Sequence, residues 1–373
     1  MKKQIPSLNG LRATSIFIVI FHHLRAAGTF GAFKAPPLLS IFLDGNFGVN
    51  VFFVISGFLI TTLLIGEEEE YGKVSLKNFY IRRIFRIFPA YYFVLLVYFI
   101  LQLCSVLYFT RESWLSSIFY YKYFFTKVDA ESAHFWSLSV EEHFYLIWPL
   151  LFILFKRFRV YTALGIILLV LLTRYLAYID RVPFPIFKSW AFIFYRMDSI
   201  MIGCLFALYK VRISNWMGKF LRFKAAPVLL LILLALSAYP TDWNITYKLH
   251  LGFLLVPLAV GTPIGTVTNI LIGILVLYSI NNKNWWFSLL NTAAMNYIGK
   301  LSYSLYLWQQ LFIMSDKLGV LNTFPLNIIC TVIAALISYY LVERPFLKLK
   351  PKFESETPQK PQKKYMYATT KAK

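Results

Sequence analysis

The sequence predicts an all-α polytopic membrane protein, a bundle of about ten transmembrane helices. Apolar residues make up 58% of the 373 residues, and aromatic residues alone make up 19%. This composition is too apolar for a globular protein with a solvated surface. The apolar residues form long continuous runs, which are typical of membrane-spanning helices and not of the alternating strands of a β-barrel. Basic residues gather in every second connecting segment, as expected of a multi-pass chain.

The predicted spans follow one another along the chain. Runs close to the length that crosses a bilayer, about 20 residues, cover 10–26, 46–66, 88–109, 136–155, 160–178, 190–209, 226–240, 258–280, 298–315 and 324–343. The seventh run is short, and Pro257, Gly261, Pro263 and Gly265 interrupt the region 245–265. Because proline and glycine break helices, we expect a kinked or re-entrant piece there, and eleven spans remain an alternative.

The basic residues predict the orientation. With the N-terminus inside, the inner segments carry Lys2, Lys3, Lys283, a lysine-rich tail and the basic residues of 73–86, 156–159 and 210–224. The outer loops hold far fewer, so the positive-inside rule gives an N-in, C-in topology. The net charge of +21 is thereby explained, and no nucleic-acid partner is expected. Residues 1–347 form the predicted membrane domain, and 348–373 a basic, disordered cytoplasmic tail that can lie on anionic lipid.

Three further patterns exclude other classes of protein. Cys104, Cys204 and Cys330 lie in separate apolar runs without the spacing of a metal site or a disulfide framework, so neither is expected. Arg12 and the adjacent histidines at 22–23 interrupt the first run, so we expect no cleavable signal peptide. The chain shows no internal repeat, which argues against a secondary transporter, the main alternative class.

Arg12 and His23 lie eleven residues apart on the first predicted helix. That spacing is about three turns plus 20°, so the two side chains share one helix face, about 16 Å apart. An ionisable residue in a transmembrane helix is costly to insert and is therefore a functional hypothesis. The alternative is structural: Arg12 anchors the helix at the interface and His23 reaches the far headgroups.

The segment 75–89 combines apolar residues with Arg82, Arg83 and Arg86 at roughly helical spacing. It predicts an interfacial amphipathic helix between the second and third spans, capped by Ser75. Clustered guanidinium groups suit the phosphates of coenzyme A or of lipid headgroups. The alternative is a plain positive-inside anchor.

Other charged residues also fall within or beside apolar runs. Two adjacent carboxylates, Glu141 and Glu142, enter the fourth span, and burial makes at least one of them costly unless it is paired. Arg196 and Asp198 in the sixth span are two residues apart, so we expect each to pair across helices, most simply in a structural ion pair. Glu343 is followed by Pro345, which is expected to end the last span.

Taken together, these stretches resemble the membrane acyltransferase family 3, integral-membrane O-acyltransferases that modify bacterial surface glycans. The resemblance runs from Pro6 to about Pro345. It rests on six motifs in order: IPSLNGLR from Ile5 with His23 after it, GVNVFFVISGFLIT from Gly48, RRIFRIFPAYY from Arg82, WSLSVEEHFYLIWP from Trp136, YRMDSIMIGCLFAL from Tyr195 and LSYSLYLWQ from Leu301.

The resemblance implies roles for individual residues. His23 is expected to be the catalytic imidazole and Arg12 the essential basic residue of its motif. Arg83 and Arg86, with Arg82 beside them, are expected to act with the acyl-CoA donor. Supporting roles fall to Ser56, Gly57, Phe58, Arg196, Asp198, Tyr303 and Tyr306. The chain departs from the family pattern at three positions: Asn50 stands where Asp is usual, His143 where Gln is usual, and Gln309 where His is usual. The departure at Gln309 leaves His23 as the main candidate for acid–base catalysis.

The expected reaction transfers an acyl group, most simply acetyl, from cytoplasmic acyl-CoA to a glycan hydroxyl outside the membrane. His23 is the expected general base, with Glu141 orienting its ring; an acyl-histidine intermediate is the variant. The donor is a substrate, and no permanently bound cofactor is expected. The resemblance places the chain in the cytoplasmic membrane of a bacterium. Larger members add an extracytoplasmic domain, so this chain is expected to act alone or with a separate extracytoplasmic partner.

Overall fold

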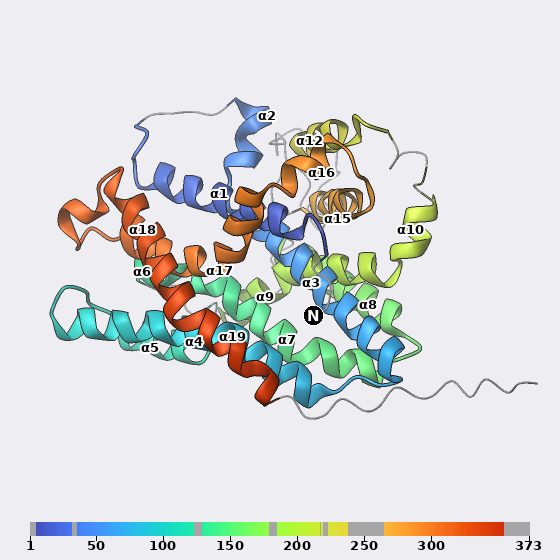
Figure 1. Ribbon diagram of the computed structural model, residues 1–373, viewed down its shortest axis with the longest axis horizontal. Helices are drawn as coiled ribbons and strands as arrows, with labels where there is room; N and C mark the ends of the chain where they lie inside the picture. The colour runs from blue at the N-terminus through green and yellow to red at the C-terminus, as the bar shows by residue number, and fades with distance from the viewer. Residues whose placement is uncertain are drawn as a thin grey trace, which may run out of the picture.

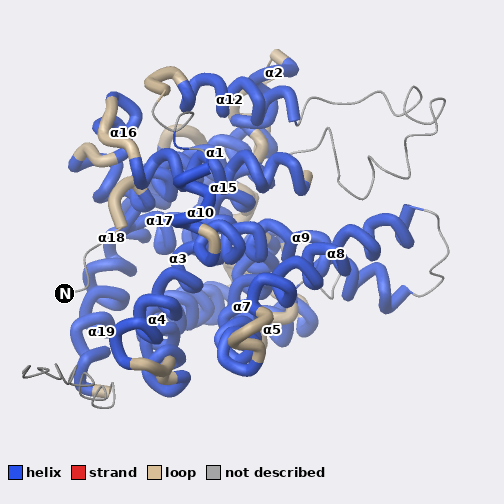
Figure 2. The backbone as a smooth tube through the Cα atoms, turned by 90° about the vertical axis from the view of Figure 1, so that its right-hand side faces the viewer, coloured by secondary structure: helices blue, strands red, loops and turns tan. Residues whose placement is uncertain are grey.

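The computed structural model describes residues 5–31, 36–122, 129–178, 185–216, 218, 223–237 and 265–353. These residues contain helices and no strand (Figure 2), so the all-α prediction is confirmed. The first half of the chain forms α1 (Leu8–Ala26), α2 (Pro37–Ser40), α3 (Gly45–Tyr71), α4 (Leu76–Leu103), α5 (Arg111–Ile118), α6 (Ala130–Ala133), α7 (Phe135–Leu154) and α8 (Arg159–Tyr178). The second half forms α9 (Pro185–Leu208), α10 (Lys210–Trp216), α12 (Ala226–Ser237), α15 (Thr266–Asn281), α16 (Trp285–Leu290), α17 (Ala293–Ile313), α18 (Leu326–Ile337) and α19 (Arg344–Leu349).

Five helical stretches are long and apolar enough to cross a membrane: Gly45–Tyr71, Leu76–Leu103, Ala130–Leu154, Arg159–Leu176 and Leu326–Leu349. The helices α12 and α15 are apolar but shorter. The chain is therefore a multi-pass membrane protein, while the count of ten spans and the orientation stay predictions. Most of the interrupted region 245–265, and the tail beyond residue 353, lie outside the described residues.

The stretch from Ser75 to Pro89 is not a separate interfacial helix, so that prediction is wrong. It is the cap and first half of α4, which continues through Pro89 to Leu103. Ser75 does cap the helix, since its hydroxyl accepts from the backbone N–H of Asn78 at 3.3 Å. The arginines of this stretch therefore belong to a bundle helix whose neighbours include α7, α17 and α19 (Figure 1). The arginines of α4 can therefore face residues of these neighbouring helices instead of the membrane interface.

The helices α3 and α9 pack backbone to backbone through two glycines. A Cβ on Gly57 would lie 1.9 Å from the carbonyl oxygen of Ile200, and a Cβ on Gly203 would lie 2.1 Å from that of Val54. No side chain fits at such distances, so the close approach requires glycine at both positions. This contact explains the glycine of the Ser-Gly-Phe-Leu motif. The neighbouring Phe58 is fully buried in the core.

Buried polar contacts then join α9 to its other neighbours. Asp198 accepts from Arg174 of α8 at 3.0 Å and from the Thr266 hydroxyl of α15 at 2.7 Å. Arg196 instead donates to the Asn50 side chain of α3 at 2.9 Å. As predicted, the two charges of α9 are satisfied across helices and not by each other. Removing one partner of such a buried pair is costly, so these contacts fix the packing of the bundle.

Candidate active site

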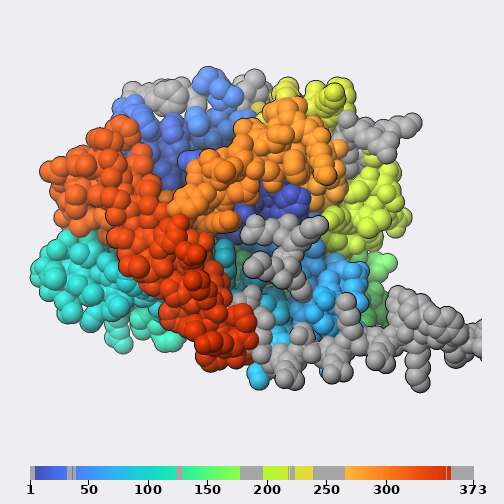
Figure 3. Space-filling model, in the orientation of Figure 1, coloured from blue at the N-terminus to red at the C-terminus, as the bar shows by residue number. Residues whose placement is uncertain are grey.

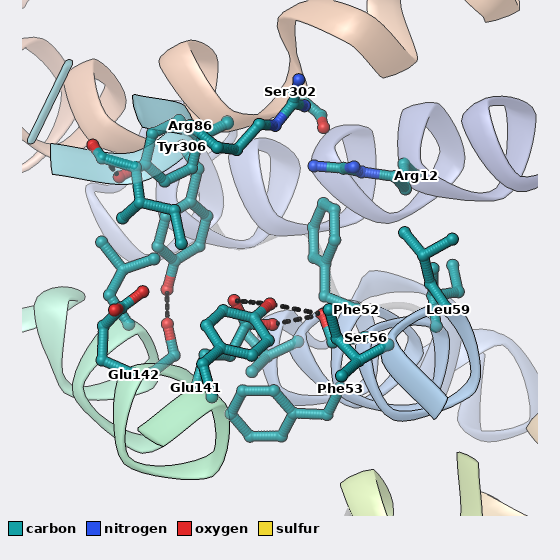
Figure 4. Close-up of a pocket in the computed structure, with 18 of the residues that line it drawn as sticks. Arg12, Phe52, Phe53, Ser56, Leu59, Arg86, Glu141, Glu142, Ser302 and Tyr306 are labelled. Carbon is teal, nitrogen blue, oxygen red and sulfur yellow. Dashed lines mark hydrogen bonds between the residues drawn. The ribbon is translucent and has the colours of Figure 1, made fainter. Parts of the chain in front are cut away.

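A cavity lies where α1, α3, α4, α7 and α17 meet (Figure 4). It encloses about 850 Å³ of space between atoms, part of it open to the outside. We call it the arginine cavity. Its polar lining consists of Arg12, Ser56, Arg83, Arg86, Ser137, Glu141, Glu142, Tyr145, Ser302, Tyr303 and Tyr306. Residues from all six sequence motifs except the one in α9 therefore meet at one place.

Three guanidinium groups line this cavity. Arg12 and Arg86 reach toward each other from α1 and α4 (Figure 4). The Arg12 Nε atom is buried without a hydrogen-bond partner, and so is the Nε atom of Arg83. The Arg83 guanidinium lies 5.6 Å from the centre of the Tyr145 ring. Arginine side chains held this way, with donors left over, suit an anionic ligand that binds several of them at once.

Arg82 does not belong to this group. It forms an ion pair with the buried carboxylate of Glu67 at the end of α3 and does not line the cavity. Adjacent residues of a helix point about 100° apart, so Arg82 and Arg83 face different neighbours. The predicted cluster of three arginines on α4 is thus corrected to two, and Arg12 of α1 takes the third place.

Glu343 lies beside Arg86 of the arginine cavity, a contact that the sequence did not predict. It is 1% exposed, lies 3.6 Å from Arg86 and accepts from the Ser304 hydroxyl at 3.1 Å. Pro345 does not end the helical stretch, because a π-helical turn, Ser338–Glu343, leads directly into α19. The red C-terminal helices in Figure 3 run across this face of the molecule and carry Glu343 to Arg86. A carboxylate inside an apolar run was the signal in the sequence.

Glu141 belongs to a hydrogen-bond network on the wall opposite Arg12. The Ser56 hydroxyl donates to Glu141 Oε1 at 2.8 Å, and the Tyr145 hydroxyl lies 3.2 Å from Ser56 Oγ and 3.3 Å from Glu141 Oε2 (Figure 4). The ring of His23 has other partners, described below. The expected contact between Glu141 and His23 is therefore absent, and Glu141 lines the arginine cavity instead.

His23 lies in a second cavity, next to the first. We call it the histidine cavity; it is lined by Val19, His22, His23, Gly45, Asn46, Val49, Ala133, His134, Trp136, Tyr306 and Gln310. Val49 and Tyr306 line both cavities. Because α1 runs unbroken from Leu8 to Ala26, Arg12 and His23 lie on one helix as predicted, but each faces its own cavity.

Two glutamines hold the ring of His23. Its Nδ1 atom lies 2.8 Å from Gln309 Oε1, and its Nε2 atom lies 3.2 Å from Gln310 Nε2. Gln310 in turn contacts His134. The sequence prediction treated Gln309 only as a lost histidine and did not consider Gln310 or His134. Two consecutive amides within an apolar helix are costly to bury, and that was the available signal.

The tyrosines of α17 connect these parts. The Tyr303 hydroxyl donates to the backbone carbonyl of Ile87 on α4 at 3.1 Å. The Tyr306 hydroxyl donates to the carbonyl of His134 at 3.0 Å and lies 2.6 Å from Ser137 Oγ. Both side chains are thereby fixed against neighbouring helices, and Tyr306 is held between the two cavities.

Comparison with known proteins agrees with this arrangement. A family model described as an acyltransferase domain matches residues 5–344. The chain is 27% identical to "Putative peptidoglycan O-acetyltransferase YrhL" of Bacillus subtilis over 92% of its own length and 55% of the relative's. It is 25% identical to "Peptidoglycan O-acetyltransferase OatA" of Listeria monocytogenes over 93% and 56%.

The chain thus spans a little over half the length of these curated relatives. No solved structure matches it. The family match covers nearly the whole chain, and five of the six sequence motifs line the arginine or the histidine cavity. The chain therefore belongs to acyltransferase family 3.

Proposed function

We propose that this chain transfers an acyl group, acetyl in the simplest case, from cytoplasmic acyl-CoA to a hydroxyl of a cell-surface glycan. The names of the relatives support O-acetyl transfer and, in two of them, peptidoglycan as the acceptor. The observation that carries the proposal is the pair of adjoining cavities: one has three arginines and the other the imidazole of His23.

The arginine cavity is the proposed donor site. Acyl-CoA carries several phosphate charges, and Arg12, Arg83 and Arg86 supply guanidinium donors for them. The three arginines lie near the start of α1 and in the first half of α4. The loop charges assign that end of the bundle to the cytoplasm, where acyl-CoA is available.

The histidine cavity is the proposed acceptor site. His23 Nε2 removes the proton of the acceptor hydroxyl as its oxygen attacks the thioester carbonyl. The new C–O bond forms, the C–S bond breaks, and the imidazolium returns the proton to the departing thiolate. Val49 and Tyr306 separate the two cavities, so the thioester must pass these side chains to reach His23.

The test uses purified protein in lipid vesicles with acetyl-CoA and soluble peptidoglycan fragments. We expect acetyl groups on the glycan by mass spectrometry and an equal release of CoA thiol. His23→Ala should lose both, whereas His143→Ala, which removes an imidazole that bonds the Ser139 carbonyl on its own helix, should keep both. Full activity of His23→Ala would overturn the assignment of the base. A wild-type protein that releases no thiol would instead support the alternative class, a transporter or exporter.

A further inference from the structure

The backbone of His134 determines which atoms of the two glutamines face His23. The His134 backbone N–H can only donate, and it lies 3.2 Å from Gln310 Oε1. The His134 ring nitrogen Nδ1 lies 2.9 Å from the same oxygen. The amide oxygen of Gln310 therefore faces His134, and the amide NH2 group faces His23.

This orientation determines the proton positions on His23. The Gln310 NH2 group can only donate, so His23 Nε2, 3.2 Å away, must offer its lone pair. A neutral imidazole with its lone pair on Nε2 carries its proton on Nδ1. That proton meets Gln309 Oε1 at 2.8 Å, an acceptor. The backbone N–H of His134 thus determines, through Gln310, which nitrogen of the His23 ring carries the proton. The contact between His23 and Gln309 agrees with this assignment.

We propose that Gln310, anchored by His134, is a positioning residue that holds His23 in the tautomer with its lone pair on Nε2. The inference rests on the proposed function, in which His23 is the general base. Gln309 supports the same tautomer from the opposite side of the ring.

Burial makes this arrangement specific. Gln309 is fully buried, Gln310 is 5% exposed and His134 is 2% exposed. Water therefore cannot replace a lost partner easily. The Gln310 amide has partners for both its oxygen and its nitrogen, so it must keep this orientation. Gln310 and His134 both line the histidine cavity with His23, so the pair acts at the place where the acceptor is proposed to bind.

The other titratable and charged groups near His23 lie on several elements. His22 is next to it on α1, with the two ring centres 5.4 Å apart. Tyr306 of α17 lines the cavity, Asp44 caps α3, and Arg196 of α9 lies over the Trp136 ring. None of them contacts Gln309 or Gln310 through a hydrogen bond that the structure records, so changes at the two glutamines leave this background the same.

The test compares two substitutions that add the same carboxylate on opposite sides of the ring. In Gln309→Glu the carboxylate accepts the Nδ1 proton, so the Nε2 lone pair remains. In Gln310→Glu the carboxylate faces Nε2 and draws a proton onto it, so the base is lost. We expect Gln310→Glu to lose about a hundredfold in kcat at every pH, about 2.7 kcal/mol. Gln309→Glu also perturbs the ring, but it leaves the lone pair on Nε2, so its kcat at alkaline pH should stay at least about tenfold above that of Gln310→Glu.

A merely structural role would affect both variants alike, so equal rates for the two would overturn the inference. If Gln310→Glu does not fold, as judged by thermal unfolding in detergent, Gln310→Met is the substitute. Methionine keeps the side-chain volume of Gln310 but removes its hydrogen bond to His23, one of the two that orient the imidazole ring. We therefore expect kcat to fall about tenfold with an unchanged Kd for acetyl-CoA. An unchanged kcat overturns the inference. If His23→Ala is active, the proposed function fails; if it is inactive while the glutamine variants behave alike, only the positioning role fails.

Discussion

Removal of either cavity arginine of α4 should weaken donor binding, whereas removal of Arg82 should not. The substitutions are Arg83→Gln, Arg86→Gln and, as the matched control, Arg82→Gln on the same helix. All three remove one positive charge. Only the first two remove a guanidinium from the arginine cavity, because Arg82 pairs with Glu67 outside it.

The expected magnitudes differ between the two. A hydrogen bond to a charged group contributes about 1.5–3 kcal/mol, and about 1.4 kcal/mol is a tenfold change in Kd. Among the described residues Arg83 forms no ion pair with a carboxylate, so we expect the upper end of this range, a loss of about a hundredfold. Arg86 already lies 3.6 Å from Glu343, so part of its charge is neutralised and we expect about tenfold.

Isothermal titration of acetyl-CoA into the purified protein measures these changes, and thermal unfolding in detergent checks that each variant is folded. Because the ligand is anionic, the wild-type Kd should also rise with salt, and less steeply in Arg83→Gln. If Arg83→Gln binds within twofold of the wild type, or Arg82→Gln loses as much as Arg83→Gln, the assignment of the donor site is wrong.

Three further predictions concern stability, measured by thermal unfolding in detergent. Ser56→Ala removes a hydroxyl that donates to the half-buried carboxylate of Glu141, so it should cost about 1–3 kcal/mol. Ser56→Thr should cost less, and a Tm equal to the wild type in Ser56→Ala would count against the network. Gly57→Ala forces a Cβ to within 1.9 Å of the Ile200 carbonyl oxygen and should lower the free energy of unfolding by at least about 1–3 kcal/mol. The control is Gly66→Ala, which lies in open space on the same helix and should be neutral or stabilising. Equal effects of the two substitutions would refute the close-packing argument. Burial lowers the pKa of Lys122, in the segment after α5, to about 8, so the unfolded chain binds more protons above that pH and stability should rise between about pH 8 and 10; Lys122→Met should remove this rise, and a persistent rise would contradict it.

The sequence predicted the fold class because its signal is local. Each apolar run reflects the environment along one helix, and every predicted run overlaps a described helix. The same holds for Arg12 and His23, since their relation depends only on one unbroken helix. The placement of Ser75 as a cap is local for the same reason.

The partners of the site residues could not be predicted in this way, because they lie far apart in the chain. Gln309 and His23 are 286 positions apart, and their contact exists only once α1 packs on α17. The separation of Arg82 from Arg83 depends on how α4 is rotated within the bundle, which no periodicity within α4 reveals. Glu343 was placed at the end of a span because the sequence does not show that Arg86 lies beside it.

The side chains that line both cavities have a consequence for side reactions. A thioester is prone to hydrolysis, and an acyltransferase that lets outside water reach its donor would consume acyl-CoA without product. Val49 and Tyr306 stand between the arginine cavity and the histidine cavity, and Tyr306 is held there by His134 and Ser137. In the proposed mechanism, this pair of side chains would bear on fidelity as well as on rate, because it would limit the water that reaches the thioester from the histidine cavity.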